Sequence, residues 1–324
     1  GSRHPPRREA TLNKLHRQEC PKCHYVRRRG DTAPPWQCPR CGIAYEKIAA
    51  VTATGNALKK PATPAKTGRR FKTIRIFILS TILVLVGADA WLTKLRTTGW
   101  DHPLRVVVYP INGDGSEAAA RYIARLDAAQ FAGIEDLVKE QALRYGITVD
   151  QPVAIALAKP VAEIPPLPPR RGNMFEIMWW SLKLRWWASD WDHYDGPTPE
   201  VRAFTLYYDP KIHPALEHST ALEKGMIGVI KLFASEKMAE QNNIVLLHEL
   251  LHTLGATDKY DMRNNEPLYP DGYAEPDLQP RLPQRKAEIM AGRIPLSRTR
   301  AEMPDHLADV VVGAKTAREI GWIK

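Results

Sequence analysis

Two histidines four positions apart, with a glutamate beside the first, are the residues whose types and spacing most directly indicate chemistry. They lie in the segment NIVLLHELLHTLGATDKY. A helix there would place His248 and His252 on one face, so that both imidazoles reach one metal ion, with Glu249 beside them. Gly255 suits a left-handed helix end that returns Asp258 toward the histidines as a third, anionic ligand. Three protein ligands leave a fourth position for water.

The rest of this helix is apolar, which predicts that it is buried with one polar face. The apolar residues are Ile244, Val245, Leu247, Leu250, Leu251 and Leu254. The alternative is a buried helix whose two histidines only form hydrogen bonds. That interpretation leaves Glu249 on a leucine-rich helix without a cation in reach, which is costly.

At these residues the chain resembles the metzincin zinc endopeptidases. Their signature HExxHxxGxx(H/D) is met by His248, Glu249, His252, Gly255 and Asp258. The final aspartate is similar to the snapalysin-like variant, and Met290 in AEIMAGRIP fits the family's methionine turn beneath the metal. The resemblance implies an α/β (α+β) domain with a mixed sheet, in which zinc polarises a water and Glu249 takes its proton.

The same resemblance assigns the rim of the substrate cleft. In metzincin-like architecture the strand shortly before the active-site helix pairs with an extended substrate. By resemblance this role falls to Gly225, Met226, Ile227, Gly228, Val229 and Ile230. The alternative is an internal strand weakened by its two glycines.

The irregular segment after Asp258 offers further candidates for the site. Tyr260, Tyr269 and Tyr273 are possible donors to a developing oxyanion, and the sequence does not choose among them. Asp261 and Asp271 are reserve candidates for the third metal ligand.

All four cysteines fall in two CxxC pairs, Cys20 with Cys23 and Cys38 with Cys41. Two such knuckles predict a four-thiolate structural zinc site in a ribbon over residues 15–48. Two disulfides or a redox CxxC are the alternatives. The prediction is therefore one structural and one catalytic zinc ion in the whole chain.

The ribbon's partner is not fixed by the sequence. Arg27, Arg28 and Arg29 with Tyr25 and Trp36 could form a basic, aromatic face for nucleic acid, anionic lipid or a cytoplasmic protein, or a solvated loop. The net charge of +10 is concentrated in the N-terminal arm. A nucleic-acid function of the whole chain is therefore only weakly indicated.

Residues 49–73 read as a flexible basic linker, and residues 74–93 as a transmembrane helix around the run IFILSTILVLVGADAWL. Basic residues are concentrated before this run, so the positive-inside rule places the N-terminus in the cytoplasm. The C-terminal domain would then be exported, to the periplasm or the outside if the protein is bacterial. A signal peptide cleaved near Ala88 and a buried core helix are the alternatives.

Residues 100–324, with 44% hydrophobic residues in the chain as a whole, are predicted to form one mixed domain. The expected strands are 104–111, 152–159, 201–208 and 224–233, and the expected helices are 117–130, 134–145 and 307–322. The Trp-rich segment MFEIMWWSLKLRWWASDW shows two apolar stripes at helical spacing. It could pack in the core or lie on a membrane surface.

The combined prediction is a membrane-anchored zinc endopeptidase that hydrolyses peptide or protein substrates. The rival is a membrane-bound sensor or regulator with a structural metal site, whose ribbon binds a cytoplasmic partner. Glu249 argues against the rival, because a purely structural site has no use for an uncoordinated carboxylate at that position.

Overall fold

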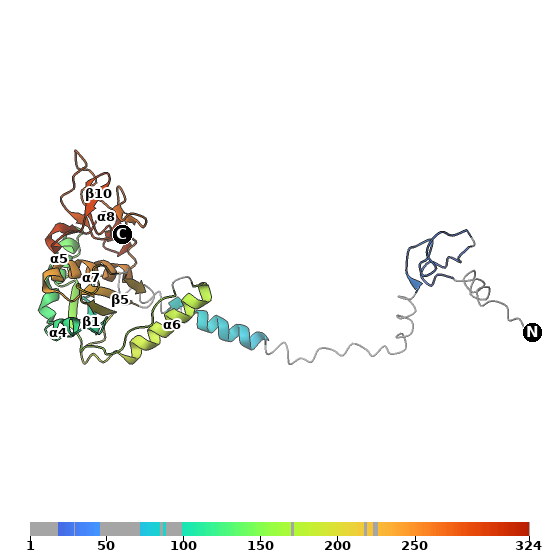
Figure 1. Cartoon of the computed structure of the whole chain (residues 1–324), viewed down its shortest axis with the longest axis horizontal. Helices are drawn as coiled ribbons and strands as arrows, with labels where there is room; N and C mark the ends of the chain where they lie inside the picture. The colour runs from blue at the N-terminus through green and yellow to red at the C-terminus, as the bar shows by residue number, and fades with distance from the viewer. Residues whose placement is uncertain are drawn as a thin grey trace, which may run out of the picture. The chain divides into compact units, whose positions relative to one another are not determined.

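The computed structural model describes residues 19–28, 30–45, 72–84, 87–88, 99–169, 172–216, 219–222 and 226–323. The chain divides into two units, Gly1–Ser80 and Thr81–Lys324 (Figure 1). Part of the predicted linker, of the predicted membrane span and of the ribbon lies outside the described residues.

A five-stranded sheet in the order β2-β1-β3-β5-β4 is the centre of the second unit. Its strands are β1 (Leu104–Asn112), β2 (Val153–Leu157), β3 (Val201–Tyr208), β4 (Thr220–Leu222) and β5 (Ile227–Phe233). β1, β2, β3 and β5 run parallel, and β4 pairs antiparallel with β5. The predicted mixed α/β domain is therefore confirmed, and β4 is a strand that the sequence did not indicate.

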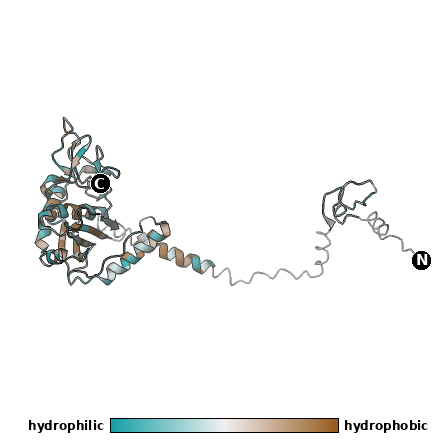
Figure 2. Ribbon diagram, in the orientation of Figure 1, coloured by the Kyte–Doolittle hydropathy of each residue, from teal (hydrophilic) through white to brown (hydrophobic). Residues whose placement is uncertain are grey.

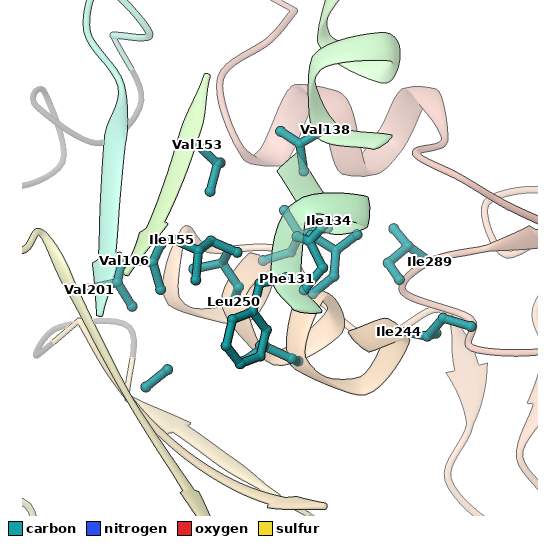
Figure 3. Packing of buried hydrophobic residues seen from close by; sticks show 14 of the residues in the cluster. Val106, Phe131, Ile134, Val138, Val153, Ile155, Val201, Ile244, Leu250 and Ile289 are labelled. Carbon is teal, nitrogen blue, oxygen red and sulfur yellow. The ribbon is translucent and has the colours of Figure 1, made fainter. Parts of the chain in front are cut away.

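Helices cover both faces of this sheet, and successive side chains of each strand enter different cores. On one face, Val106 and Val108 of β1 pack with α4 (Glu117–Ile123), α5 (Ala132–Arg144) and α7 (Ala239–Thr253), as Figure 3 shows in part. On the other face, Val107 and Tyr109 of β1 pack with α6 (Met174–Asp190). A parallel sheet needs this double cover, because both of its faces are apolar.

The C-terminal part of this unit consists of short elements rather than one closing helix. They are β6 (Tyr260–Asp261), β7 (Glu266–Pro267), β8 (Ala287–Glu288), β9 (Ile294–Ser297), β10 (Arg300–Glu302), a 3-10 turn at Leu307–Asp309, β11 (Val310–Val311) and α8 (Ala314–Glu319). Two further 3-10 turns, Ala128–Phe131 and Glu236–Met238, come directly before α5 and α7. The prediction of a helix over 307–322 is wrong. Val310 and Val311 pair in parallel with β8, and Gly313 then begins the short α8. β-branched residues favour the strand.

The second unit is closed on itself by contacts between its two ends. The indole Nε1 of Trp100 donates to the carbonyl of Ile320 at 2.7 Å, and the rings of Trp100 and Trp322 lie 5.6 Å apart. Among the described residues, those that form the two hydrophobic cores of this unit all lie from Trp100 onward. Residues 100–324 thus carry both cores, as a separately folding domain requires.

Residues 72–84 and 87–88 are helical, and Figure 2 shows residues 72–84 as a largely hydrophobic segment. Its large apolar side chains, such as Phe77, Leu79 and Leu83, are exposed. Within the described parts of the chain, no helix reaches both the length and the apolar character of a membrane span. Residues 85–86 and 89–93 of the predicted span lie outside those parts, so the predicted span is not confirmed.

Candidate metal centres

The four cysteines converge on one point, as their spacing predicts. The sulfur atoms of Cys20 and Cys41 lie 3.6 Å apart, as do those of Cys23 and Cys38. A disulfide would need about 2.0 Å, and all four cysteines are free, so the alternative of two disulfides is not what the structure shows. Four thiolates at about 2.3 Å from one zinc ion would lie about 3.8 Å from one another, so the set fits zinc.

The two knuckles have the same backbone design. The N–H of His24 donates to the carbonyl of Cys20 at 2.8 Å, and the N–H of Gly42 donates to Cys38 at 2.9 Å. His24 and Gly42 both have positive φ, 57° and 70°. Each turn thus brings its two sulfurs to the same side, and Gly42 takes its left-handed conformation without a steric cost.

Burial and hydrogen bonds give two of these thiols very different pKa values. A backbone hydrogen bond at Tyr25 favours the thiolate of Cys23, but desolvation and the other three sulfurs raise its pKa to about 12. Burial opposes charge on Cys38, but the backbone N–H groups of Cys41 and Arg40 lower its pKa to about 6. A divalent cation at the centre would remove the conflict by stabilising all four thiolates.

The predicted basic face of the ribbon is smaller than the sequence indicated. Arg27 is buried, and its guanidinium donates to the backbone carbonyls of Ala33, Pro34 and Gln37. This arginine holds the loop between the knuckles and is not available to a partner. Trp36 is 56% exposed.

The second centre stands on α7, whose buried side chains pack against the sheet. His248 and His252 project from the opposite side, one turn apart, and their Nε2 atoms lie 3.0 Å from each other. Their Nδ1 atoms are 2.9 Å from the carbonyl of Ile289 and 2.8 Å from the carbonyl of Ala256. A carbonyl only accepts, so each Nδ1 carries a proton, and each ring in its neutral form would offer the Nε2 lone pair to a metal ion.

Asp258 supplies the third donor, as predicted. Gly255, with φ of 98°, follows the helix end and turns the chain back. The Oδ1 atom of Asp258 then lies 3.2 Å from Nε2 of His248 and 3.1 Å from Nε2 of His252. Burial opposes a charge on Asp258, but its contacts with the two imidazoles lower its pKa below the usual range. The third ligand is therefore anionic at neutral pH.

This set of three donors fits a zinc ion. Bonds of about 2.1 Å in tetrahedral geometry separate neighbouring ligand atoms by about 3.4 Å, close to the separations found. Asp258 Oδ1 is buried without a hydrogen-bond donor, which costs free energy unless a cation balances it. His248, His252 and Asp258 thus form a candidate metal site separate from the cysteine cluster.

Met290, which the resemblance assigned to a methionine turn, is joined through its backbone to the segment that carries Asp258. Its side chain is fully buried, and its carbonyl accepts from the N–H of Lys259 at 2.9 Å. The preceding carbonyl, that of Ile289, is the acceptor that orients His248. The methionine turn therefore touches both the first ligand and the residue after the last one.

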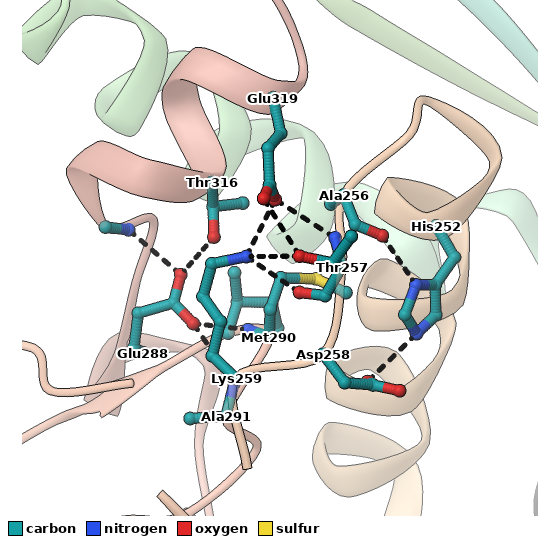
Figure 4. A network of polar contacts seen from close by, with 12 residues as sticks. His252, Ala256, Thr257, Asp258, Lys259, Glu288, Met290, Ala291, Thr316 and Glu319 are labelled. Atoms are coloured by element: carbon teal, nitrogen blue, oxygen red, sulfur yellow. Dashed lines mark hydrogen bonds and ion pairs between the residues drawn. The ribbon is translucent and has the colours of Figure 1, made fainter. Parts of the chain in front are cut away.

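A buried carboxylate that nothing in the sequence singled out holds this turn in place. Glu288 is 0% exposed, and its Oε2 accepts from the N–H groups of Met290 and Ala291 at 2.7 and 3.0 Å. Its Oε1 accepts from the Gly313 N–H and the Thr316 hydroxyl at 3.1 and 2.6 Å. Burial raises the pKa of Glu288, and the hydrogen bonds from Thr316, Gly313 and Met290 and the charge of Lys259 oppose this shift (Figure 4).

A second buried contact fixes the segment that carries Asp258. The ammonium of Lys259, 3% exposed, donates to Glu319 of α8 at 2.7 Å and to the carbonyl of Thr257 at 2.7 Å. Glu319 also accepts from the N–H and hydroxyl of Thr257. Figure 4 shows this cluster beside Asp258 and His252. The residues on both sides of the third ligand are thus tied to the C-terminal helix.

A pocket of about 560 Å³ opens onto the centre, with His248, Glu249 and Tyr260 in its wall. Glu249 is only 8% exposed. Tyr260 lies with its ring 6.5 Å from that of His248. Desolvation, with Asp258 and Glu249 nearby, raises the pKa of Tyr260 to about 12, so it remains a hydrogen-bond donor at neutral pH.

The other candidates of the irregular segment lie elsewhere. Tyr269 and Tyr273 pack on each other, with ring centroids 5.4 Å apart, and neither lines the pocket. Asp261 pairs with Arg263 at 2.6 Å. Asp271 is exposed and belongs to no cluster of metal-ligating groups in the described residues. Among these candidates, Tyr260 lies in the pocket wall, and Asp258 lies within metal-binding distance of both histidines.

The predicted rim strand differs from expectation in one respect. Ile227, Gly228 and Val229 of β5 pair with β4 on one side and with β3 on the other. This part of β5 is internal, and the edge of the sheet on this side is β4. Gly225 lies outside the described residues, and the carbonyl of Met226 accepts from Arg202.

Comparison of the sequence with models of known protein families finds no match, and no curated protein matches it either. What the chain does must therefore be argued from these two centres and their surroundings.

The two separate donor sets predict two zinc ions in the full chain and one in residues 100–324. Asp258→Ala should weaken zinc binding to that fragment, because it removes the anionic donor. The Cys20→Ser, Cys38→Ser double variant of the full chain should lose one ion and keep the other. Metal analysis by mass spectrometry measures both. A fragment that purifies without metal and takes up no added zinc would contradict the histidine–aspartate site.

We expect Glu288→Gln to weaken zinc binding by about 10- to 100-fold, although Glu288 touches no ligand. In the variant, an amide NH₂ group replaces one of the two acceptor oxygens and faces the N–H or hydroxyl groups that donate to this oxygen in the parent. This loss of hydrogen bonds should disturb the turn that orients His248. Glu302→Gln, at a half-exposed carboxylate, is the matched control and should bind zinc normally. Competition with a zinc chelator gives both affinities. Equal affinities would show that the turn does not depend on Glu288.

Proposed function

We propose that residues 100–324 form a metzincin-like, zinc-dependent endopeptidase. The observation that carries the proposal is the position of Glu249, a nearly buried carboxylate in the pocket wall beside the ligand His248. A structural metal site needs no such group. A hydrolase needs a base at this place, next to the side from which a substrate approaches.

The roles of the residues follow from their chemistry. When bound, zinc would supply Lewis-acid polarisation of the scissile carbonyl and of water. Glu249 would take the proton of the attacking water and pass it to the leaving amine. Tyr260, kept protonated by its surroundings, would donate a hydrogen bond to the oxygen that becomes negative.

The pocket and the sheet edge indicate how a peptide would bind. Apolar side chains form much of the pocket wall, among them Leu216, Phe233, Val245 and Met303. Such a lining favours a large hydrophobic substrate side chain. Because β5 is internal, an extended peptide would add to the outer edge of β4 rather than to β5.

Glu249→Gln tests the proposal, because it keeps the side-chain size and removes no metal ligand. We expect hydrolysis of a peptide library by residues 100–324 to fall at least about 100-fold, with zinc content unchanged. Glu117→Gln, at an exposed carboxylate of α4, is the control. If the Glu249→Gln variant and the parent cleave equally fast, or if neither cleaves, the domain is better explained as a metal-stabilised sensor or regulator.

We further propose that a single membrane span near residues 74–93 separates a cytoplasmic ribbon, with its own protein partner, from an exported peptidase domain. The excess of basic residues before the span and the absence of cysteine after Cys41 support this topology.

A reporter that is active only outside the cytoplasm tests this topology. It should work when fused after Lys324 and fail when fused after Lys60. The reverse pattern would overturn the orientation, and a mature soluble protein that begins near Trp91 would favour a cleaved signal peptide.

A further inference from the structure

Helix α6 has two apolar faces, and only one of them is used by the fold. Trp180, Leu184, Trp187 and Ala188 are buried in the core beneath the sheet. On the opposite face, Phe175, Met178, Trp179, Leu182 and Trp186 follow helical spacing as a single stripe, which we call the outer stripe. Core packing, one of the two interpretations of this Trp-rich segment, therefore holds for one face of the helix. The other interpretation, contact with a membrane surface, concerns the exposed face.

The side chains of the outer stripe are unusually exposed to solvent for large apolar residues. Phe175 and Trp186 are each 76% exposed, Trp179 is 60% exposed, and Met178 and Leu182 are more than half exposed. Large contiguous apolar patches on a soluble domain mark binding surfaces. The helix itself is well anchored, since Asn173 and Glu176 form a complete capping box at its start. The stripe is thus presented by an ordered element.

Two cations flank the outer stripe. In a view down the axis of an ideal helix, Lys183 projects about 80° to one side of Phe175, and Arg185 about 80° to the other side. The ammonium of Lys183 lies 5.7 Å from the ring centroid of Trp179. Arg170 and Arg171 precede the helix in the sequence.

The acidic residues of α6 are at its two ends. Glu176 is engaged in the capping box, and Asp190 is the last residue of the helix. The middle of the stripe is therefore bordered by positive charge only.

This pattern matches the physical chemistry of a bilayer interface. Tryptophan prefers the headgroup region, because its ring is apolar and its N–H is polar. Lysine and arginine beside an apolar stripe extend their charges to lipid phosphates while their methylene groups stay in the apolar layer. We propose that the outer stripe of α6 docks residues 100–324 onto an anionic membrane surface.

The proposal is independent of the peptidase function and of the predicted span, so it is testable on residues 100–324 alone. This fragment should float with vesicles of phosphatidylcholine containing about one third phosphatidylglycerol, and less with phosphatidylcholine alone. The Trp179→Ser, Trp186→Ser double variant should lower the partition coefficient at least about tenfold. Lys183→Gln should lower it roughly fivefold on the anionic vesicles.

Matched controls separate docking from misfolding. Leu143→Ser replaces a side chain of α5 that is 65% exposed, and it should bind vesicles like the parent. Phe175→Ser with Leu182→Ser changes the same stripe at other positions and should reproduce the loss. Circular dichroism would establish that each variant is folded.

A second measurement uses the full chain in nanodiscs with brominated lipids. Bromine near the headgroups should quench tryptophan fluorescence in the parent more than in the Trp179→Phe, Trp186→Phe variant. Vesicle binding that is absent, or that survives loss of the outer stripe, would overturn the proposal. Sedimentation that shows two copies of the fragment joined through the outer stripe would also overturn the proposal. The same holds for a full chain in which the brominated lipid does not quench these tryptophans.

Discussion

The second metal centre depends on three lone pairs that are forced to face one another. Nε2 of His248, Nε2 of His252 and Oδ1 of Asp258 lie 3.0 to 3.2 Å from one another, so a proton on either Nε2 must leave before all three atoms can bind one cation. The carbonyls of Ile289 and Ala256 hold the Nδ1 protons on the far sides of the rings. Such an arrangement is unfavourable unless a cation lies at its centre, so the surrounding structure must be rigid enough to maintain it.

That rigidity comes from segments distant in sequence. α7 is held by its apolar side against the parallel sheet, and β8 and α8 bring Glu288 and Glu319 to the opposite side of the centre. Glu288 satisfies four donors at once, and Lys259 joins the Asp258 segment to Glu319. Both buried charges have partners, which is the condition under which a charge can remain inside a protein. The C-terminal elements thus position the ligands rather than merely completing the fold.

The same domain uses apolar surface in two ways. Around the sheet, apolar side chains are removed from water on both faces, and this burial accounts for the fold. On α6, a second apolar stripe stays outside, bordered by Lys183 and Arg185. A helix that is apolar all round would ordinarily be fully buried. Its half-buried state fits the docking that we propose, because a bilayer is an external apolar phase that also suits tryptophans and cations.

The sequence alone determined the parts that depend on local spacing. Histidines four apart share a helix face, a glycine ends that helix, and two CxxC pairs make knuckles, because these geometries need only neighbouring residues. Strands β1 and β3 followed from β-branched runs in the same way. Tertiary structure decided the rest. Only long-range packing could place Tyr260 rather than Tyr269 in the pocket wall and add β4 outside β5. Long-range packing also delayed the expected C-terminal helix until after Gly313 and buried Glu288 against the backbone of Met290. Each of these outcomes depends on which distant segment occupies the neighbouring space.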